Sequence, residues 1–163
     1  MKLSTNHTKG YTIIELMVVV GIIALLLGLS LNSLNNLIQW NKLNVAAALL
    51  SSELKNTQSM AFYEGVSYKI EFYPTFDWPT SLNKYKIFKV CELYKELYKE
   101  IKLEDIDLFK TNFTGNKVFF YPSGVPGQGG TVTLKNRRGK ILYVIMTPVT
   151  ARVRVSPDPP ENW

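Results

Sequence analysis

Glu15 is the one charged side chain in the 21 residues from Tyr11 to Leu31, which are otherwise almost entirely apolar. An unpaired carboxylate in lipid costs at least about 2.5 to 3.5 kcal/mol on insertion scales, so an acid in such a position usually has a cationic partner. The simpler interpretation is a glutamate in the first turn of a helix, stabilised by the helix dipole. The two interpretations differ for Glu15→Ala, because only the first makes association with a partner depend on the carboxylate.

Residue types that support enzymatic chemistry are scarce. Cys91 is the only cysteine, which excludes an intramolecular disulfide and a thiolate metal site built from this chain alone. His7 is the only histidine, and a chain that loses its first residues has no histidine base and no HExxH zinc site. No motif singles out paired carboxylates or a Ser–Lys pair. We therefore expect a structural protein and not an enzyme, with no cofactor and no metal site.

Basic residues gather in the last third of the chain. The formal net charge is +6, and no acid occurs between Leu108 and Pro157. Such a surface can bind phosphates without reading bases, which would make DNA a salt-sensitive and nonspecific partner. The same charges can instead be solvated, or can pair with the acidic segment 92–107. The residues considered for DNA binding are Arg137, Arg138, Lys140, Arg152 and Arg154.

The spacing of these basic residues predicts where they lie. Arg152 and Arg154 alternate with Val153 and Val155, so both guanidinium groups are expected on one face of a strand. Residues 136–139, NRRG, form a turn signal, which places the other three basic residues at a hairpin tip.

The apolar stretch from Tyr11 to Leu31 is long enough to span a membrane, because 21 helical residues extend about 30 Å. A secretory signal peptide is the competing explanation. It is disfavoured because the following residues, LSLNSLNNLIQW, continue in helical register instead of offering a cleavage site. Glu15 also has no use in an ordinary signal peptide.

The helix is predicted to continue well beyond the apolar stretch. Apolar residues recur at helical spacing as far as Phe62, and no proline occurs between Tyr11 and Tyr73. One helix is therefore expected from about Thr12 to Phe62, with an amphipathic second half and a stop at Gly65.

After Gly65 the hydrophobic period shifts to two, which predicts a β-rich head. Residues 76–79, FDWP, are expected to form a loop, and the four-residue spacing of apolar residues in 92–102 favours a short amphipathic helix. The fold class expected is α+β, with a long N-terminal α-helix packed on a small antiparallel β-rich head. The predicted strands are residues 66–72, 84–91, 101–109, 117–121, 131–134, 141–146 and 152–155.

The segment KGYTIIELMVVVGIIALL, which starts at Lys9, resembles the class III signal of type IV pilins and pseudopilins. The resemblance implies that a prepilin peptidase cuts between Gly10 and Tyr11 and that Tyr11 is N-methylated, although Phe is commoner at that position. It also implies that Glu15 pairs with the new α-amino group of a neighbouring subunit during filament assembly.

The run VFFYPSGVPGQGGTVTLKNRRGKILYVIMTPVTARVRV resembles the C-terminal half of the H-type minor pseudopilin and FimT family. Phe120, Pro122 and Gly124 occupy the places of that family's Phe-x-Pro-x-Gly element. Arg152 and Arg154 match its closing element, whereas Ala151 stands where the family often has Gly. Some members of the FimT branch bind DNA.

Together these features predict a minor pilin or pseudopilin of a type II secretion system or type IV pilus. The alternative is a DNA-binding minor pilin of a competence pilus. The expected partners are a prepilin peptidase, other pilins and the inner or cytoplasmic membrane, which one helix crosses with the head outside the cytoplasm. The expected segments are a leader (1–10), a transmembrane and filament-core helix (11–31), an amphipathic helix (32–63), a β-rich head (64–156) and a Pro-rich tail (157–163).

Overall fold

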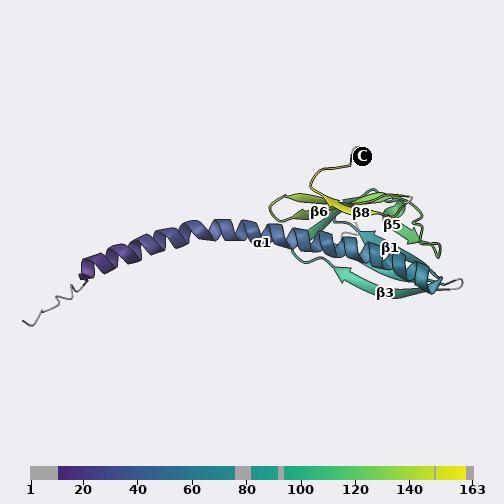
Figure 1. Ribbon diagram of the computed structural model, residues 1–163, viewed down its shortest axis with the longest axis horizontal. Helices are drawn as coiled ribbons and strands as arrows, with labels where there is room; N and C mark the ends of the chain where they lie inside the picture. The colour runs from purple at the N-terminus through teal and green to yellow at the C-terminus, as the bar shows by residue number, and fades with distance from the viewer. Residues whose placement is uncertain (1–10, 76–81, 92–93, 149, 161–163) are drawn as a thin grey trace, which may run out of the picture. The chain divides into compact units, whose positions relative to one another are not determined.

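The computed structural model describes residues 11–75, 82–91, 94–148 and 150–160, except for the side chains of 29–33. The chain divides into two compact units, residues 1–38 and 39–163. The loop predicted at 76–79 lies outside the described residues. Figure 1 shows the order of the elements along the chain.

Helix α1 runs from Ile13 to Glu64 and contributes to both units. It begins after Thr12, whose side-chain oxygen accepts a hydrogen bond from the Glu15 backbone N–H at 3.3 Å, as an N-cap residue does. It ends at Gly65, whose φ of +65° lies in the left-handed region that glycine adopts without strain. The structure thus confirms the long helix predicted from Thr12 to Phe62 and its stop at Gly65.

The part of α1 in the second unit is amphipathic. Its fully buried residues recur at intervals of three, four and seven, which places them on one face of the helix. The apolar residues Val45 and Leu49 lie on the opposite face and are exposed. Burying one leucine side chain contributes about 1.5–3 kcal/mol, so this face holds the helix on the head. The fully buried residues are Leu43, Ala47, Leu50, Leu54 and Ala61.

The head contains two four-stranded antiparallel sheets (Figure 1). The first, sheet A, has the order β3-β2-β1-β5, and the second, sheet B, has the order β4-β6-β7-β8. Sheet A comprises β1 (Ser67–Tyr73), β2 (Lys84–Val90), β3 (Lys95–Lys102) and β5 (Lys117–Phe120). Sheet B comprises β4 (Ile106–Thr111), β6 (Gly130–Asn136), β7 (Ile141–Met146) and β8 (Val153–Ser156). A short 3-10 turn, η1 (Thr114–Asn116), precedes β5.

One hydrophobic core joins both sheets to the head part of α1. In β1, buried Tyr68, Ile70 and Phe72 alternate with partly exposed residues, as the period-two pattern predicts. Phe72 stacks on Phe113 with ring centroids 5.5 Å apart. The predicted α+β class, a long helix packed on an antiparallel β head, is therefore confirmed.

Two predictions about the middle of the head are wrong. The short helix predicted within 92–102 is an edge strand over Lys95–Lys102, apart from residues 92 and 93, which are not described. Charged side chains on this strand find partners on sheet A and α1, and these long-range pairs override the local apolar spacing. The single strand predicted over 101–109 is divided between the two sheets, with Asp105 at a φ of +64° in the turn between them.

Candidate filament-assembly site and basic residues

The start of α1 presents a carboxylate on an exposed apolar surface. Thr12 caps the helix, so Glu15 lies in its first turn. The Tyr11 side chain is 87% exposed, and the side chains of Ile13, Ile14 and Leu16 around Glu15 are also exposed. Gly10, the residue predicted before the cleavage site, lies outside the described residues.

A shallow hollow of about 260 Å³ lies beside Glu15 and is lined by Tyr11, Glu15, Leu16 and Val19. Within the described part of the chain, Glu15 forms no salt bridge. An exposed apolar surface of this extent usually marks a contact with a membrane or another protein. The Glu15 carboxylate can therefore bind a cationic group of another molecule whose apolar surface packs against the start of α1.

No helix within the described residues has the length and apolar character needed to cross a membrane. The span predicted over residues 11–31 includes positions 29–31, whose side chains the structure does not describe, and it stays a prediction.

In the head, most acids of the described residues are neutralised by nearby lysines. Glu71 forms salt bridges with Lys69 and Lys95, at 2.6 and 2.9 Å. Glu100 forms salt bridges with Lys84 and Lys86, at 2.9 and 3.0 Å. These pairs lie on the face of sheet A turned away from the core, because Lys69, Glu71, Lys84 and Lys86 alternate with buried residues. Two further pairs, Glu64–Lys89 and Glu53–Lys99, join α1 to β2 and β3.

Glu71 gives the head a predicted acid sensitivity. Burial alone would raise its pKa, but hydrogen bonds from Lys69, Lys95 and Tyr73 outweigh it and hold the pKa at about 2, against 4.5 for the free side chain. Stability from a depressed carboxyl pKa is present above the unfolded-state pKa and is lost as pH falls through the folded-state value. Glu71→Gln is therefore expected to lower the free energy of unfolding at pH 7 by about 1–2 kcal/mol, allowing for solvent screening.

The measurement is urea unfolding, at a series of pH values, of the detergent-solubilised chain and the variant. The difference in the free energy of unfolding between the two proteins should shrink as pH falls from about 4.5 towards 2. A difference that stays constant over this range would contradict the assignment. Glu96→Gln is the matched control, because Glu96 is exposed on the edge strand and forms no salt bridge among the described residues.

The basic residues predicted to bind DNA fall into two separate groups. Arg137, Arg138 and Lys140 lie in the turn between β6 and β7, as predicted. Arg154 lies opposite Ile145, which is five residues along β7 from Lys140 or about 17 Å. Arg152 lies further away, before the start of β8. The register therefore does not bring the five residues together on one site.

The two groups also differ in their surroundings. Arg137 pairs with Asp105, which confirms for this residue the alternative of pairing with the acidic segment. Arg152 and Arg154 are both exposed and form no salt bridge within the described residues. Val153 is buried beside Arg154 as predicted, whereas Val155 is 41% exposed at the sheet edge.

The sequence did not indicate that Asp105 is the centre of an ion-pair network of three residues. Its carboxylate contacts Lys42 of α1 and Arg137 of the turn, each at 2.5 Å. A hydrogen bond from Lys42, and then the Arg137 charge, hold the pKa of Asp105 below its usual value. The partners lie 63 and 32 residues from Asp105 in the chain, and the sequence offered only a run of acids, Glu104, Asp105 and Asp107, inside what was predicted as a single strand.

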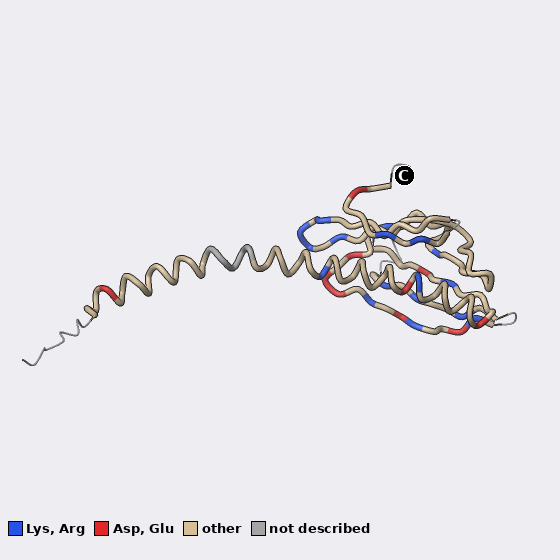
Figure 2. The backbone as a smooth tube through the Cα atoms, viewed as in Figure 1, with Lys and Arg blue, Asp and Glu red and all other residues tan. Residues whose placement is uncertain are grey.

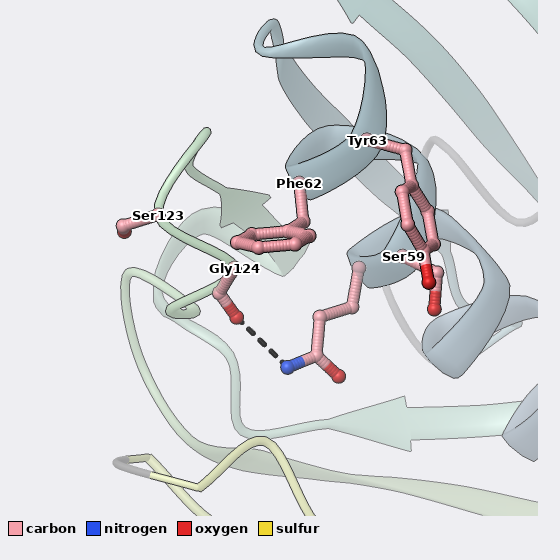
Figure 3. A pocket seen from close by; sticks show the side chains of 6 residues that line it. Ser59, Phe62, Tyr63, Ser123 and Gly124 are labelled. Carbon is pink, nitrogen blue, oxygen red and sulfur yellow. Dashed lines mark hydrogen bonds between the residues drawn. The ribbon is translucent and has the colours of Figure 1, made fainter.

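The Phe-x-Pro-x-Gly element has a structural role at the end of α1. The side-chain amide of Gln58 donates to the Gly124 carbonyl at 2.8 Å, and Figure 3 shows Phe62 lying over Gly124. Gly124 has a φ of +76°, which favours glycine, whereas a Cβ added there would make only an ordinary contact with the Phe62 ring, at 3.6 Å. Beside them lies an open groove of about 330 Å³, lined also by Ser59, Tyr63 and Ser123.

The model of the prokaryotic N-terminal methylation motif matches residues 5–31 of the chain. A search of curated proteins by sequence finds no match. Among solved structures, the minor pseudopilin EpsH from the type 2 secretion system of Vibrio cholerae is similar, with a TM-score of 0.57 at 9% identity over 71% of this chain and 96% of that one. The type IV minor pilin FimU of Pseudomonas aeruginosa, in one crystal form, has a TM-score of 0.56 at 14% identity over 72% of this chain and 90% of that one.

The motif and the structural similarity are two separate findings on this chain. The motif covers the start of α1, including Tyr11 and Glu15, while the identity to the solved structures is too low to show more than their fold. The chain therefore carries a prokaryotic N-terminal methylation motif and has a fold similar to that of a minor pseudopilin and a type IV minor pilin.

Proposed function

We propose that the chain is a minor pilin or pseudopilin, a structural subunit of the filament of a type II secretion system or a type IV pilus. The observation that carries the proposal is the presence in one chain of the methylation motif and the pilin-like head. The exposed Glu15 in the first turn of α1 supports an assembly role for this end of the chain.

Processing follows from the motif. A prepilin peptidase removes residues 1–10 between Gly10 and Tyr11, and the new amino group of Tyr11 is methylated. The subunit sits in the inner or cytoplasmic membrane through residues 11–31, with its head outside the cytoplasm. During assembly Glu15 pairs with the Tyr11 amine of a neighbouring subunit, which neutralises both charges in apolar surroundings.

The test is the intact mass of the protein purified from a host that contains the prepilin peptidase. The mass is expected to correspond to a chain that begins at singly methylated Tyr11. The Gly10→Val variant serves as the control and should retain the full leader. A wild-type chain that begins elsewhere, or that keeps residues 1–10 beside an active peptidase, would contradict the proposal.

A second candidate function is nonspecific DNA binding. It is favoured by Arg154 on β8 and Arg152 just before it, which are exposed and form no salt bridge within the described residues. Two guanidinium groups can contact phosphates without reading bases, and such binding weakens as salt rises. A mobility shift of duplex DNA at low salt that disappears in the Arg152→Ala/Arg154→Ala variant would support it. The absence of any shift would remove it.

A further inference from the structure

Lysines outnumber acids on one face of sheet A. This face is the side of the sheet to which Lys69 and Lys84 point, away from the core, and we call it the outer face. Residues directly opposite in antiparallel strands point to the same side, and Lys95 pairs with outward Glu71, so six lysines lie here. Among the described residues only two acids share the face, Glu71 and Glu100, which leaves a charge of +4. The lysines are Lys69, Lys84, Lys86, Lys95, Lys102 and Lys117.

The outer face is open to solvent. Its charged side chains are all partly or fully exposed, and the core lies on the other side of the sheet, so no described element buries this face. Figure 2 shows the lysines and glutamates that β3 contributes along one edge of the head. Lysine ammonium groups also lie over aromatic rings: Lys69 is 5.6 Å from the ring centres of Phe88 and Phe119, and Lys95 is 3.5 Å from that of Phe88. These contacts limit the positions that the lysine side chains adopt.

One end of the outer face is cationic. Lys84 lies directly opposite Lys102 of β3, and Lys86 follows Lys84 by two residues, or about 7 Å along β2. Glu100 forms salt bridges with Lys84 and Lys86, so three lysines and one acid leave a charge of +2 at this end. Like charges directly opposite each other destabilise a sheet, and two carboxylates bound here would neutralise this end.

An apolar row lies next to the cationic end. Leu97, Phe88 and Phe119 belong to one register row across the sheet. Leu97 is 49% exposed, and the two phenylalanines are partly exposed. Along β2, the side chains of Lys84, Lys86 and Phe88 point to the outer face at equal spacing. A ligand that lies along this strand therefore meets two cations and then an apolar contact.

We propose that the outer face of sheet A binds an extended acidic segment of a partner protein, with two carboxylates at alternate positions and an apolar side chain two residues further on. Alternate side chains of an extended segment are about 6.6–6.8 Å apart, which is also the spacing of Lys84, Lys86 and Phe88 along β2. Glu71 and Glu100 show how such carboxylates are held, because each lies between two lysines at 2.6–3.0 Å. The contact involves the head alone and depends neither on membrane insertion nor on filament assembly.

The size of the outer face favours an extended segment over a folded domain. Sheet A has four strands, the longer of which have seven or eight residues. At the usual strand spacing and rise, its face covers roughly 300–450 Å². A stable interface between folded proteins buries about 800 Å² on each partner. The outer face is about half that size, which suits a few residues of extended chain.

A peptide also fits the outer face better than a nucleic acid does. Nucleic-acid sites on open sheets stack bases on aromatic rings, whereas the ammonium groups of Lys69 and Lys95 already lie over Phe88. Leu97 offers a contact that an apolar side chain of a peptide can use and a phosphate cannot.

The experiment measures the fluorescence anisotropy of a synthetic peptide mixed with the full chain in a non-ionic detergent. The peptide is Gly-Thr-Glu-Thr-Glu-Thr-Leu-Thr-Gly, capped at both ends and labelled with an uncharged fluorophore. Half-saturation is expected below about 1 mM, and the affinity should fall as salt rises. A reference peptide has the same composition with the two glutamates adjacent. Adjacent side chains of an extended segment point to opposite sides, so the reference peptide should bind several-fold more weakly.

The decisive comparison is between two variants that lose the same charge. Lys84→Ser/Lys102→Ser keeps Lys86 as the partner of Glu100 and should weaken peptide binding about tenfold. Arg152→Ser/Arg154→Ser, in and just before β8 of the other sheet, should leave binding unchanged. Leu97→Ser changes a side chain that is already half exposed, and should weaken binding about fivefold because an apolar contact with the peptide is lost.

Equal weakening in the two charge variants would overturn the proposal, because the peptide would then respond to the total charge of the chain and not to the outer face. Equal affinity for the two peptides, unchanged binding in Leu97→Ser, or no saturation by about 1 mM would also overturn it. Displacement of the peptide by a single-stranded thymidine oligonucleotide at equal concentration of charge would assign the outer face to nucleic acid instead.

Discussion

Glu15→Ala is expected to leave the subunit in the membrane and to remove it from filaments. In the proposed assembly, the Tyr11 amine of one subunit is neutralised by Glu15 of another. Without the carboxylate that amine is a buried, unpaired cation, and a charge left unpaired in an apolar setting costs several kcal/mol. A loss of this size reduces incorporation by at least about a hundredfold. The measurement is the amount of variant that copurifies with sheared filaments, relative to the amount in the membrane.

Two further variants distinguish a role of Glu15 in assembly from the simpler interpretation, in which it only stabilises the first turn of α1. Thr12→Ala removes the side chain that caps α1 but keeps the carboxylate, and should cost only about 1 kcal/mol of helix stability. Filament incorporation should therefore survive in Thr12→Ala and fail in Glu15→Gln. If Glu15→Gln assembles normally, the glutamate acts only on the helix dipole and the proposed pairing is wrong.

The elements that sequence predicted well are those fixed by local patterns. The absence of proline, the apolar period and Gly65 together define α1, and the period-two runs define β1, β2, β5 and β7 to within a residue or two at each end. Strand β3 was not predictable in this way. Its residues Lys95, Lys99 and Glu100 are held by partners on β1, α1 and β2, as far as 46 residues away in the chain.

In the candidate site, too, the features that local sequence patterns determine could be predicted, and those that depend on long-range contacts could not. Glu15 stands out in sequence because a charge in an apolar stretch is conspicuous whatever the fold. The hairpin tip with Arg137, Arg138 and Lys140 was also predictable, but its separation from Arg152 and Arg154 was not, since the pairing of Arg154 with Ile145 depends on the register of β7 and β8. The link from Asp105 to Lys42 and Arg137 depends on the arrangement of both sheets around α1, which no local pattern reports.

The edges of the two sheets indicate how such a subunit can join others. Edge strand β3 carries three lysines, β4 has a register shift between Leu108 and Lys110, and β8 is followed at once by Pro157. Lysines, bulges and prolines at an edge all oppose the addition of a strand from another chain. These three edges therefore do not favour strand pairing between heads, which is consistent with the proposed assembly through the N-terminal helix.

Lys99→Ala is expected to destabilise the head more than any other change of a single exposed charge. Its partner Glu53 lies on the buried face of α1, with a side chain only 8% exposed, and Lys99 reaches it from β3 at 2.5 Å. Removing one member of a buried ion pair leaves the other charged in a low dielectric. Because Lys99 itself is half exposed, we expect a loss of about 2–4 kcal/mol in the free energy of unfolding, measured by urea denaturation.

A second substitution shows whether the unpaired charge is the cause. Glu53→Gln in the Lys99→Ala background removes the buried charge and should recover most of the lost stability, which a double-mutant cycle measures as a coupling between the two positions. Lys102→Ala is the matched control, because this exposed lysine on the same strand has no salt bridge within the described residues and should change stability by no more than about 0.5 kcal/mol. Additive effects of the two changes would show that Glu53 and Lys99 do not act as a pair.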